Sequence, residues 1–374
     1  MNWISDPHLR GLAWMALSLL LSCVLTALAI RYARRNNVVD QPGQRRSHST
    51  PTPRGGGIGI VVCGVLGLIA LPLLELHIDL QLRFIASIVL IAAIGWIDDH
   101  RPLPAWLRFL VQMLAVGVWL APLLRVALIP SADASALGTS QFETAGVALL
   151  LVVLTLWSVN LHNFMDGIDG LLATQAIFVL SALTVLGLRE SSSPHPLQLA
   201  MWIAAILGFL PFNFPRARVF MGDVGSGVIG LIIAVAIVWQ TSMPEIAFAS
   251  GFIAVSAFAT DATCTLLSRM LSGRRWYSAH REHLYQWLTR TGMSHARVVM
   301  LYMGWNVLVV APVLWWINRK VIVEQDNAMS LASGLPWAIG VYVLAVALWI
   351  CGKRYCARRL RSVGAETRLA HASA

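Results

Sequence analysis

The chain has 374 residues, of which 57% are hydrophobic and only 12% are charged, and its formal net charge is +10. About a quarter of the residues in a typical soluble domain are charged, so this composition excludes an ordinary soluble protein and indicates a polytopic membrane protein. The positive charge does not require a nucleic-acid partner, because Lys and Arg accumulate in the cytoplasmic loops of membrane proteins.

Apolar runs long enough to cross a bilayer about 30 Å thick follow one another along the chain. The first is too long for the core of a signal peptide, and no small-residue cleavage site follows it, so we expect it to be retained. The predicted fold is one all-α, polytopic transmembrane domain over residues 1–374, with about eleven transmembrane helices at 11–31, 57–77, 80–97, 105–129, 144–161, 168–188, 197–213, 224–241, 244–268, 296–317 and 334–352.

The loops between these runs differ in charge, which predicts the orientation. With the N-terminus outside and the C-terminus cytoplasmic, most Lys and Arg residues fall on the cytoplasmic side, as the positive-inside rule requires. We expect the active site on this face, with loops 31–56, 98–108, 160–168, 213–223 and 269–297 forming it and 353–374 as a basic tail. The outer segments 130–144, 191–196 and 324–327 carry no motif. The five cysteines form no CxxC pair, so we assign the cysteines no disulfide or metal site.

Two carboxylate pairs stand at the ends of apolar runs. Asp98 and Asp99 are adjacent, and such carboxylates repel each other unless a cation or proton lies beside them, which predicts a Mg²⁺ site or a general base. Asp166 and Asp169, each followed by a glycine, lie in the stretch 160–172. A charged group near hydrocarbon costs several kcal/mol unless hydrated, paired or metal-bound, so they mark a functional site by default. A helix cap and a polar turn are the structural alternatives.

Three further segments combine basic residues with glycine or histidine. Arg54 precedes Gly55, Gly56 and Gly57, whose backbone N–H groups we expect to wrap an anion at the next helix start, while an ordinary basic loop accounts for Arg45 and Arg46. Asp223 opens another helix after Pro215, Arg216 and Arg218, and the glycines at 222, 225 and 227 exceed what a cap needs, which indicates a ligand-contacting loop.

His280 and His283 are three residues apart, so a helix would place them on one face. No cysteine or third histidine nearby completes a tetrahedral zinc site, so contact with a pyrophosphate fits better. Taken together, the segments predict Mg²⁺-assisted chemistry between a phosphorylated cytosolic donor and a membrane acceptor. A P-loop is absent from the sequence. A secondary transporter would carry its site near mid-bilayer. An intramembrane aspartyl protease could use Asp166 and Asp223 but leaves the other groups unexplained.

Four motifs in order resemble the polyprenyl-phosphate N-acetylhexosamine-1-phosphate transferases: Asp98-Asp99, Asn163-Phe-Met-Asp166-Gly-Ile-Asp169-Gly, Phe220-Met-Gly-Asp223-Val-Gly-Ser226 and a final inner loop with histidines. The resemblance extends nearly from the start of the chain to Gln286. It implies transfer of a sugar 1-phosphate from a UDP-N-acetylhexosamine to undecaprenyl phosphate, with release of UMP, at the cytoplasmic face of a bacterial inner membrane. A homodimer is left open.

The resemblance also implies roles for individual residues. Asp223 would bind Mg²⁺, with Mn²⁺ as an alternative, together with Asp98, Asp99 and Asn163. One aspartate of the adjacent pair would deprotonate or orient the lipid phosphate. The remaining expected contacts are with the donor or lipid substrate, by Arg54, Gly56, Asn163, Asp166, Asp169, Asn213, Arg218, Ser226, His280 and His283.

Two departures bear on the donor sugar. The peptidoglycan branch resembles Lys-x-Gly-Thr-Pro-Thr before its glycines, where this chain has Ser47-His-Ser-Thr-Pro-Thr52, and it has consecutive histidines where this chain has His280-Arg-Glu-His283. Both argue against a phospho-MurNAc-pentapeptide donor and favour the O-antigen-initiating branch. The sugar stays open between N-acetylglucosamine and a 6-deoxy-amino sugar such as N-acetylfucosamine or N-acetylquinovosamine. Direct attack by the lipid phosphate and a covalent aspartyl intermediate are both compatible with the sequence.

Overall fold

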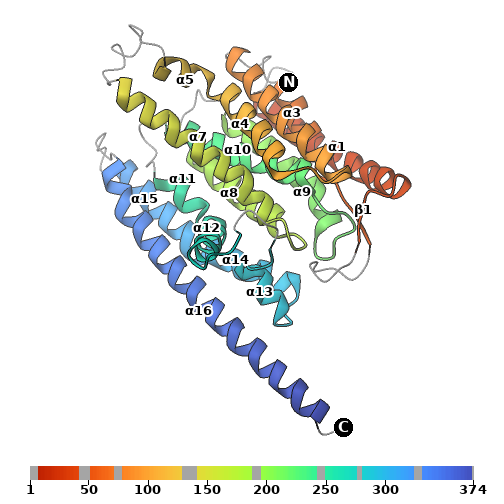
Figure 1. Cartoon of the computed structure of the whole chain (residues 1–374). Coiled ribbons are helices and arrows are strands. Elements are labelled where there is room, and N and C mark those ends of the chain that lie inside the picture. Colours follow the sequence, from red (N-terminus) through yellow and green to blue (C-terminus); the bar gives the residue numbers. More distant parts are fainter. Residues whose placement is uncertain are drawn as a thin grey trace.

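A computed structural model describes residues 7–41, 51–70, 78–128, 141–187, 195–241, 249–275, 280–323 and 331–372, and within them the chain is almost entirely helical (Figure 1). The elements are α1 Pro7–Arg35, β1 Val39–Asp40, β2 Thr52–Pro53, α2 Ile58–Ala70, α3 Ile78–His100, α4 Ala105–Trp119, α5 Ala121–Leu128, α7 Gln141–Phe164, α8 Leu171–Gly187, α9 His195–Asn213, α10 Asp223–Thr241, α11 Ala249–Ala254, α12 Ser256–Leu271, α13 Leu284–Arg290, α14 His295–Trp305, the π-helical turn η2 Asn306–Val310, α15 Ala311–Val323 and α16 Leu331–Ala372.

Helix α10 is the centre of the bundle. It packs against α2, α3, α7, α8 and α9, and its apolar side chains are almost completely buried around its whole circumference. A helix that is hydrophobic on every face belongs in a core. Small residues let its neighbours come close: at Gly230 an added Cβ would stand 2.5 Å from the carbonyl oxygen of Ser158 in α7. The polar start of α10, at Asp223, is therefore held at one end of the core.

The structure confirms an all-α polytopic membrane protein. Six helices of the described chain are long and apolar enough to cross a membrane, and α4 with α5 would make a seventh although they meet at an 80° bend. Shorter apolar helices occupy residues 58–70, 171–187 and 223–239. Each of the eleven predicted runs thus has a helical counterpart, but the run 244–268 is divided at Val255 into α11 and α12. The number of complete crossings stays a prediction.

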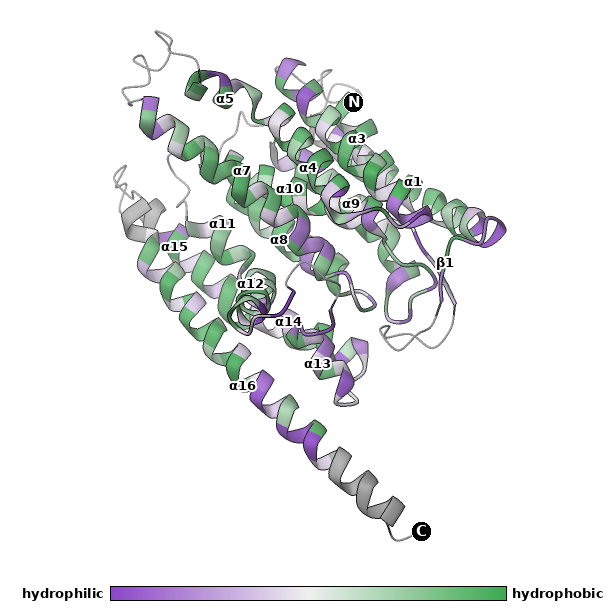
Figure 2. Ribbon diagram, in the orientation of Figure 1, coloured by the Kyte–Doolittle hydropathy of each residue, from purple (hydrophilic) through white to green (hydrophobic). Residues whose placement is uncertain are grey.

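The polar segments gather at one end of the bundle. Helices α1, α3, α7 and α9 end there and α2, α8 and α10 begin there, next to the short antiparallel pairing of β1 with β2. Figure 2 shows apolar residues along the middle of the helices and hydrophilic residues around β1 and α13. The two-residue strands are the one described departure from an all-helical chain, and they join the loop before Arg54 to the end of α1.

Helices α11 to α16 form the other side of the molecule. The long helix α16 packs against α11, α12 and α13 and then continues past the bundle (Figure 1). Contacts of α14 and α11 with α8 join this group to the core. The segment with His280 and His283 lies between α12 and α13, so its position depends on how the two groups of helices meet.

Candidate active site

Asp98, Asp99 and Asp223 come together because the end of α3 crosses the start of α10. An added Cβ at Gly95 would stand 2.5 Å from the backbone of Asp223, so only glycine allows this approach. Gly222 has φ +78°, and an added Cβ would meet the carboxylate of Asp99 at 2.4 Å. The glycines thus bring three carboxylates from two helices into one cluster.

The two adjacent aspartates have different surroundings. Asp99 accepts hydrogen bonds from the backbone N–H groups of Asp223 (2.9 Å) and Val224 (3.2 Å), and its side chain is 0% exposed. It therefore caps α10 from outside that helix. Asp98 accepts from the backbone N–H of Leu103 (2.7 Å), and its side chain is 10% exposed. Asp98 is the more accessible of the pair, whereas Asp99 is committed to holding α10.

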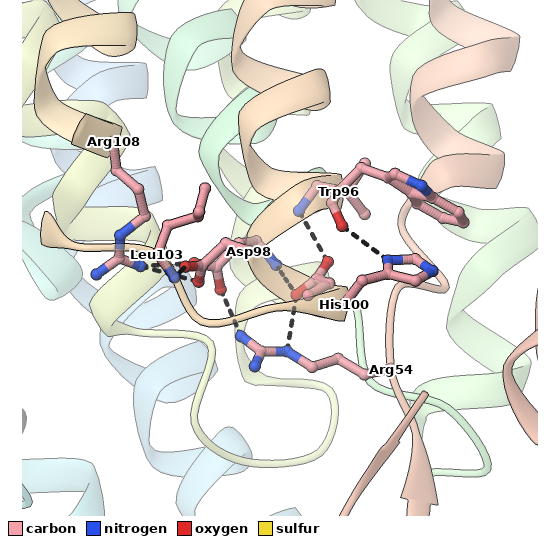
Figure 3. Close-up of polar contacts among 9 residues, drawn as sticks. Arg54, Trp96, Asp98, His100, Leu103 and Arg108 are labelled. Atoms are coloured by element: carbon pink, nitrogen blue, oxygen red, sulfur yellow. Dashed lines mark hydrogen bonds and ion pairs between the residues drawn. The ribbon is translucent and has the colours of Figure 1, made fainter. Parts of the chain in front are cut away.

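Two arginines stand between the carboxylates (Figure 3). Arg54 contacts Asp99 at 2.8 Å and Asp223 at 2.6 Å, and Arg108 contacts Asp98 at 3.1 Å and Asp223 at 3.0 Å. Burial opposes the charge of Arg54, but Asp99 and Asp223 outweigh it and raise the pKa of the guanidinium. The cluster is thus a network in which cations and carboxylates alternate.

The oxygen atoms of Asp98, Asp223 and Asn163 are the candidate ligands for Mg²⁺ in this cluster. Within the described residues, no three His, Cys, Asp or Glu side chains are grouped so that they would hold a metal by themselves. Asp98 and Asp223 do lie within hydrogen-bonding distance of each other, and the amide of Asn163 reaches Asp223. Two repelling carboxylates and an amide oxygen are hard ligands, and Mg²⁺ commonly takes one or two carboxylates and fills its shell with water and substrate phosphates. The set fits Mg²⁺ shared with a substrate.

The expectation that the glycines after Arg54 wrap an anion is contradicted for two of the three, Gly56 and Gly57, and stays a prediction for Gly55. The N–H groups of Gly56 and Gly57 donate to the carbonyl oxygens of Phe220 and Met221, both at 2.9 Å. An added Cβ at Gly57 would stand 2.6 Å from Gly225. These glycines therefore serve close packing against the loop before Asp223, and this packing carries Arg54 to the carboxylates.

Asp166 and Asp169 occupy the turn between α7 and α8 but point to different partners. Burial raises the pKa of Asp166 to about 7, against the opposing charge of Arg54, and the carboxylates of Asp223 and Asp99 raise it further. Asp166 thus belongs electrostatically to the cluster. Asp169 accepts from the N–H of Ala217 at 3.0 Å and lies 3.2 Å from Nδ1 of His295, so it ties this turn to the next loop and to α14.

Two more predicted substrate contacts have protein partners in this structure, and the hydroxyl of a third, Ser226, is buried without a hydrogen-bond partner among the described residues. The buried Asn213 accepts from the N–H of Gly170 (2.9 Å) and donates to the carbonyl oxygen of Val219 (3.0 Å), which joins two loops of the site. Arg218 donates to the carbonyl oxygen of Pro211 and lies over Phe212. Ser226 is 1% exposed inside the first turn of α10. Their contacts with a substrate stay predictions.

The two histidines do not share a helix, contrary to expectation. His280 lies outside any helix, and His283 is the residue before α13, with the ring centres 5.0 Å apart. Burial lowers the pKa of His280 to about 4, and His283 and Arg269 lower it further; burial also lowers the pKa of His283. Both imidazoles are therefore neutral at pH 7 and available as hydrogen-bonding groups.

Tyr285 docks the histidine segment, residues 280–290, on the Asp166 turn, residues 165–170 between α7 and α8. Its hydroxyl donates to the carbonyl oxygen of Phe164 at 2.9 Å, and it occupies the place where a Cβ on Gly167 would be, at 2.0 Å. His283 stacks on Tyr285 and on Phe164 at ring distances of 5.7 and 6.3 Å. The glycine after Asp166 is required for this contact.

An apolar cavity of about 480 Å³ lies between α7, α10, α12 and α16. Its lining on α7 includes Leu161 and His162, directly before Asn163. An apolar ligand inside it would therefore reach the polar turn of the site along α7.

Sequence reasoning missed Arg108 and His295. Arg108 lies in the first turn of α4, and Pro102 and Pro104 in the short connection from Asp98 were a signal that the connection returns the chain sharply. His295 follows the N-cap Ser294 of α14, and nothing in its neighbourhood pointed to Asp169. The predictions for Arg45, Arg46, segment 47–50 and most of the outer segments fall outside the described residues.

The chain is similar to known proteins over most of its length. The model of the family "Glycosyl transferase family 4" matches residues 82–241, which contain all the aspartates discussed above. A Mycobacterium tuberculosis decaprenyl-phosphate N-acetylglucosaminephosphotransferase is 31% identical over 79% of this chain and 80% of its own length.

Two other relatives are similar over a comparable length. A probable undecaprenyl-phosphate N-acetylglucosaminyl 1-phosphate transferase of Bacillus subtilis is 29% identical over 80% of this chain and 82% of its own. The Escherichia coli undecaprenyl-phosphate alpha-N-acetylglucosaminyl 1-phosphate transferase is 25% identical over 73% and 75%. The extent and identity of these matches show that this membrane protein belongs to glycosyl transferase family 4.

Proposed function

We propose that the protein transfers an N-acetylhexosamine 1-phosphate from a UDP-N-acetylhexosamine to undecaprenyl phosphate, releasing UMP. The observation that carries the proposal is the alternation of Asp98, Asp223, Arg54 and Arg108 at the polar end of the bundle. Phosphoryl transfer needs positioned cations to neutralise the charge that develops on transferring and leaving oxygens. The relatives named above act on polyprenyl phosphates, which supports the same acceptor class here.

The acceptor is assigned to the apolar cavity between α7 and α12. Part of its polyprenyl chain would lie there, and its phosphate would extend past Asn163 to the cluster. Asp98, the more accessible aspartate, would take a proton from the lipid phosphate. An oxygen of that phosphate would then form a bond to the sugar-linked phosphorus, the bond from this phosphorus to the bridging oxygen would break, and UMP would leave with the electron pair.

The other residues hold the donor and the charges. Asp223 and Asn163 would bind Mg²⁺, which when bound supplies charge neutralisation at the diphosphate, while Asp98 acts as the proton acceptor. Arg54 and Arg108 keep the carboxylates oriented, and the neutral His280 and His283 would donate hydrogen bonds to the donor. Because the donor is cytosolic, this end of the bundle is assigned to the cytoplasmic face of a bacterial inner membrane.

The test is transfer by the purified protein in detergent with Mg²⁺, undecaprenyl phosphate and radiolabelled UDP-N-acetylglucosamine. UDP-linked 6-deoxy-amino sugars and UDP-MurNAc-pentapeptide are assayed in parallel. Formation of a lipid-linked sugar and UMP supports the proposal, and Asp223→Asn should lower turnover at least about a thousandfold. If no donor yields both products, the proposal fails.

Two finer assignments are tested by the same reaction. A product from N-acetylglucosamine or a 6-deoxy-amino sugar, and none from the pentapeptide donor, would place the enzyme at the first membrane step of O-antigen or a related envelope polysaccharide. Direct attack predicts no exchange of labelled UMP into the donor when the lipid is omitted. Such exchange would instead support a covalent phosphosugar intermediate on an aspartate.

A further inference from the structure

Asp261 is a buried carboxylate that neither the sequence motifs nor the proposed reaction uses. It lies in α12, inside the apolar run 244–268, and it is only 2% exposed. A carboxylate in such a place is costly unless donors surround it. Its surroundings therefore indicate what it is there to hold.

The carboxylate of Asp261 receives hydrogen bonds from four helices. Oδ1 accepts from the N–H of Leu284 (2.7 Å), the indole N–H of Trp349 (3.0 Å) and the hydroxyl of Thr265 (3.2 Å). Oδ2 accepts from the hydroxyl of Tyr302 (2.7 Å) and the N–H of Tyr285 (3.4 Å). A carboxylate offers about four lone-pair sites, so this one is saturated. It has no capacity left for a substrate.

Two of these donors are the first backbone N–H groups of α13. A helix start leaves such groups without partners inside the helix, and they are usually satisfied by a Ser, Thr, Asp or Asn at the N-cap. The N-cap of α13 is His283, whose own N–H donates to the side chain of Gln286 at 3.2 Å. Nδ1 of His283 has no hydrogen-bond partner among the described residues and lies 4.0 Å from Oδ1 of Asp261. Asp261 therefore satisfies the N–H groups of Leu284 and Tyr285 from another helix.

The position of α13 in turn sets the position of the histidine segment, residues 280–290. Tyr285 lies in its first turn and reaches the Asp166 turn through Phe164 and Gly167. A second set of contacts, centred on Glu282, holds the same segment. The carboxylate of Glu282 pairs with Arg269 and Arg274, and Lys353 of α16 donates to the backbone carbonyl oxygen of the same residue. Because these contacts remain when Asp261 is changed, the segment would shift rather than detach.

We propose that Asp261 is a positioning residue, which fixes the histidine segment against the Asp166 turn so that His280 and His283 meet the nucleotide-sugar donor. The proposal rests on the proposed function for the identity of that donor. It predicts that removing hydrogen bonds to the Asp261 carboxylate weakens binding of the nucleotide sugar. Binding of undecaprenyl phosphate should stay unchanged, because Asp261 does not line the apolar cavity.

The test compares full-length variants in detergent. Asp261→Asn turns one acceptor oxygen into a donor that faces other donors, whereas Asp261→Glu keeps the charge. Tyr302→Phe and Trp349→Phe each remove one bond to the carboxylate. Ser22→Ala is the matched control, since it removes a buried hydroxyl that donates to the carbonyl oxygen of Ala205 and touches neither Asp261 nor the apolar cavity.

Two readouts are measured on each variant. In Asp261→Asn we expect hydrogen exchange of residues 284–290 to be about tenfold faster, and KM for the nucleotide sugar to rise about tenfold with KM for undecaprenyl phosphate unchanged. Asp261→Glu should bring the exchange rate and the KM for the nucleotide sugar part of the way back to wild type. Tyr302→Phe and Trp349→Phe should raise the same two quantities by less than Asp261→Asn does. Ser22→Ala should leave the exchange rate and both KM values at the wild-type level.

The proposal is overturned if exchange of residues 284–290 is unchanged, if exchange rises equally in α12, α14 and α16, or if both KM values rise together. Should Asp261→Asn fail to fold, Tyr302→Phe and Trp349→Phe decide by the same criteria. The exchange measurement needs no substrate. A wild-type protein without transferase activity would therefore refute the proposed function separately, and unchanged exchange beside normal transfer would refute only the role of Asp261.

Discussion

Asp98 and Asp99 are neighbours with the same side chain, and the structure predicts opposite consequences when each is changed to asparagine. Asp99 accepts from the Arg54 guanidinium and from two backbone N–H groups of α10, with a side chain that is 0% exposed. Asp98 lies within reach of Asp223 and contacts Arg108 at a partly open position. Asp99→Asn should therefore act mainly on stability and Asp98→Asn mainly on turnover.

The magnitude follows from the contacts. Asparagine at position 99 has one acceptor oxygen, so its NH₂ group must face one of three donors. Losing a helix cap costs about 1 kcal/mol and losing a charge-assisted bond about 2 kcal/mol, so the free energy of unfolding should fall by about 3 kcal/mol. At position 98 the lost contact with Arg108 is offset by relief of the repulsion from Asp223, so we expect a change of about 0–1 kcal/mol. Turnover should fall about a hundredfold or more, because a charge beside the transferring phosphate is removed.

The assay measures thermal unfolding by intrinsic tryptophan fluorescence and initial rates of sugar-phosphate transfer well below the melting temperature. Asp79→Asn is the matched control, because Asp79 lies on the same helix α3 with a side chain that is 77% exposed. It should change neither quantity. An Asp99→Asn protein that melts like the wild type, or an Asp98→Asn protein with near-normal turnover, would refute the assignment of the two roles.

Three further predictions concern Arg108, Gly167 and Asp166. Arg108→Ala should lower turnover about tenfold to a hundredfold, because Asp98 and Asp223 lose the cation that orients them. Arg83→Ala is the control, since the Arg83 side chain is equally 33% exposed, and it should leave turnover unchanged. Equal turnover in the two variants would contradict the role of Arg108. Gly167→Ala should lower the melting temperature because its Cβ would collide with the Tyr285 hydroxyl, and adding Tyr285→Phe should recover part of the loss, whereas Gly146→Ala, with open space around it, should be harmless. Additive effects at positions 167 and 285 would count against the collision. Since burial raises the folded-state pKa of Asp166 to about 7, the unfolded chain ionises first, and this group lowers stability as pH rises from about 4 to 7. Asp166→Asn should therefore gain stability relative to wild type at pH 7.5 compared with pH 4.5, and melting curves that shift equally at the two pH values would contradict this.

The glycines and histidines show where sequence reasoning reached the right residues with the wrong geometry. The glycines after Arg54 and those around Asp223 lie at the candidate site and allow close backbone packing, and the N–H groups of Gly56 and Gly57 donate to carbonyl oxygens instead of facing an anion. The histidines do lie in one segment, but before the helix rather than on it. Spacing reports which local conformations are open to a segment, and the partners across the bundle decide which one is adopted.

The sequence by itself determined the membrane class, the helical runs, the gathering of the aspartate motifs at one end and the start of α10 at Asp223. These are local or compositional properties, since apolar length, charge and helix-start signals act within a few residues. Only the tertiary structure separated Asp98 from Asp99, brought in Arg108 and gave Asp261 a partner, because each of these depends on contacts between helices. The hydrogen bond between Asp99 and Asp223 joins residues that are 124 positions apart in the chain, and local sequence patterns do not predict contacts over such a separation.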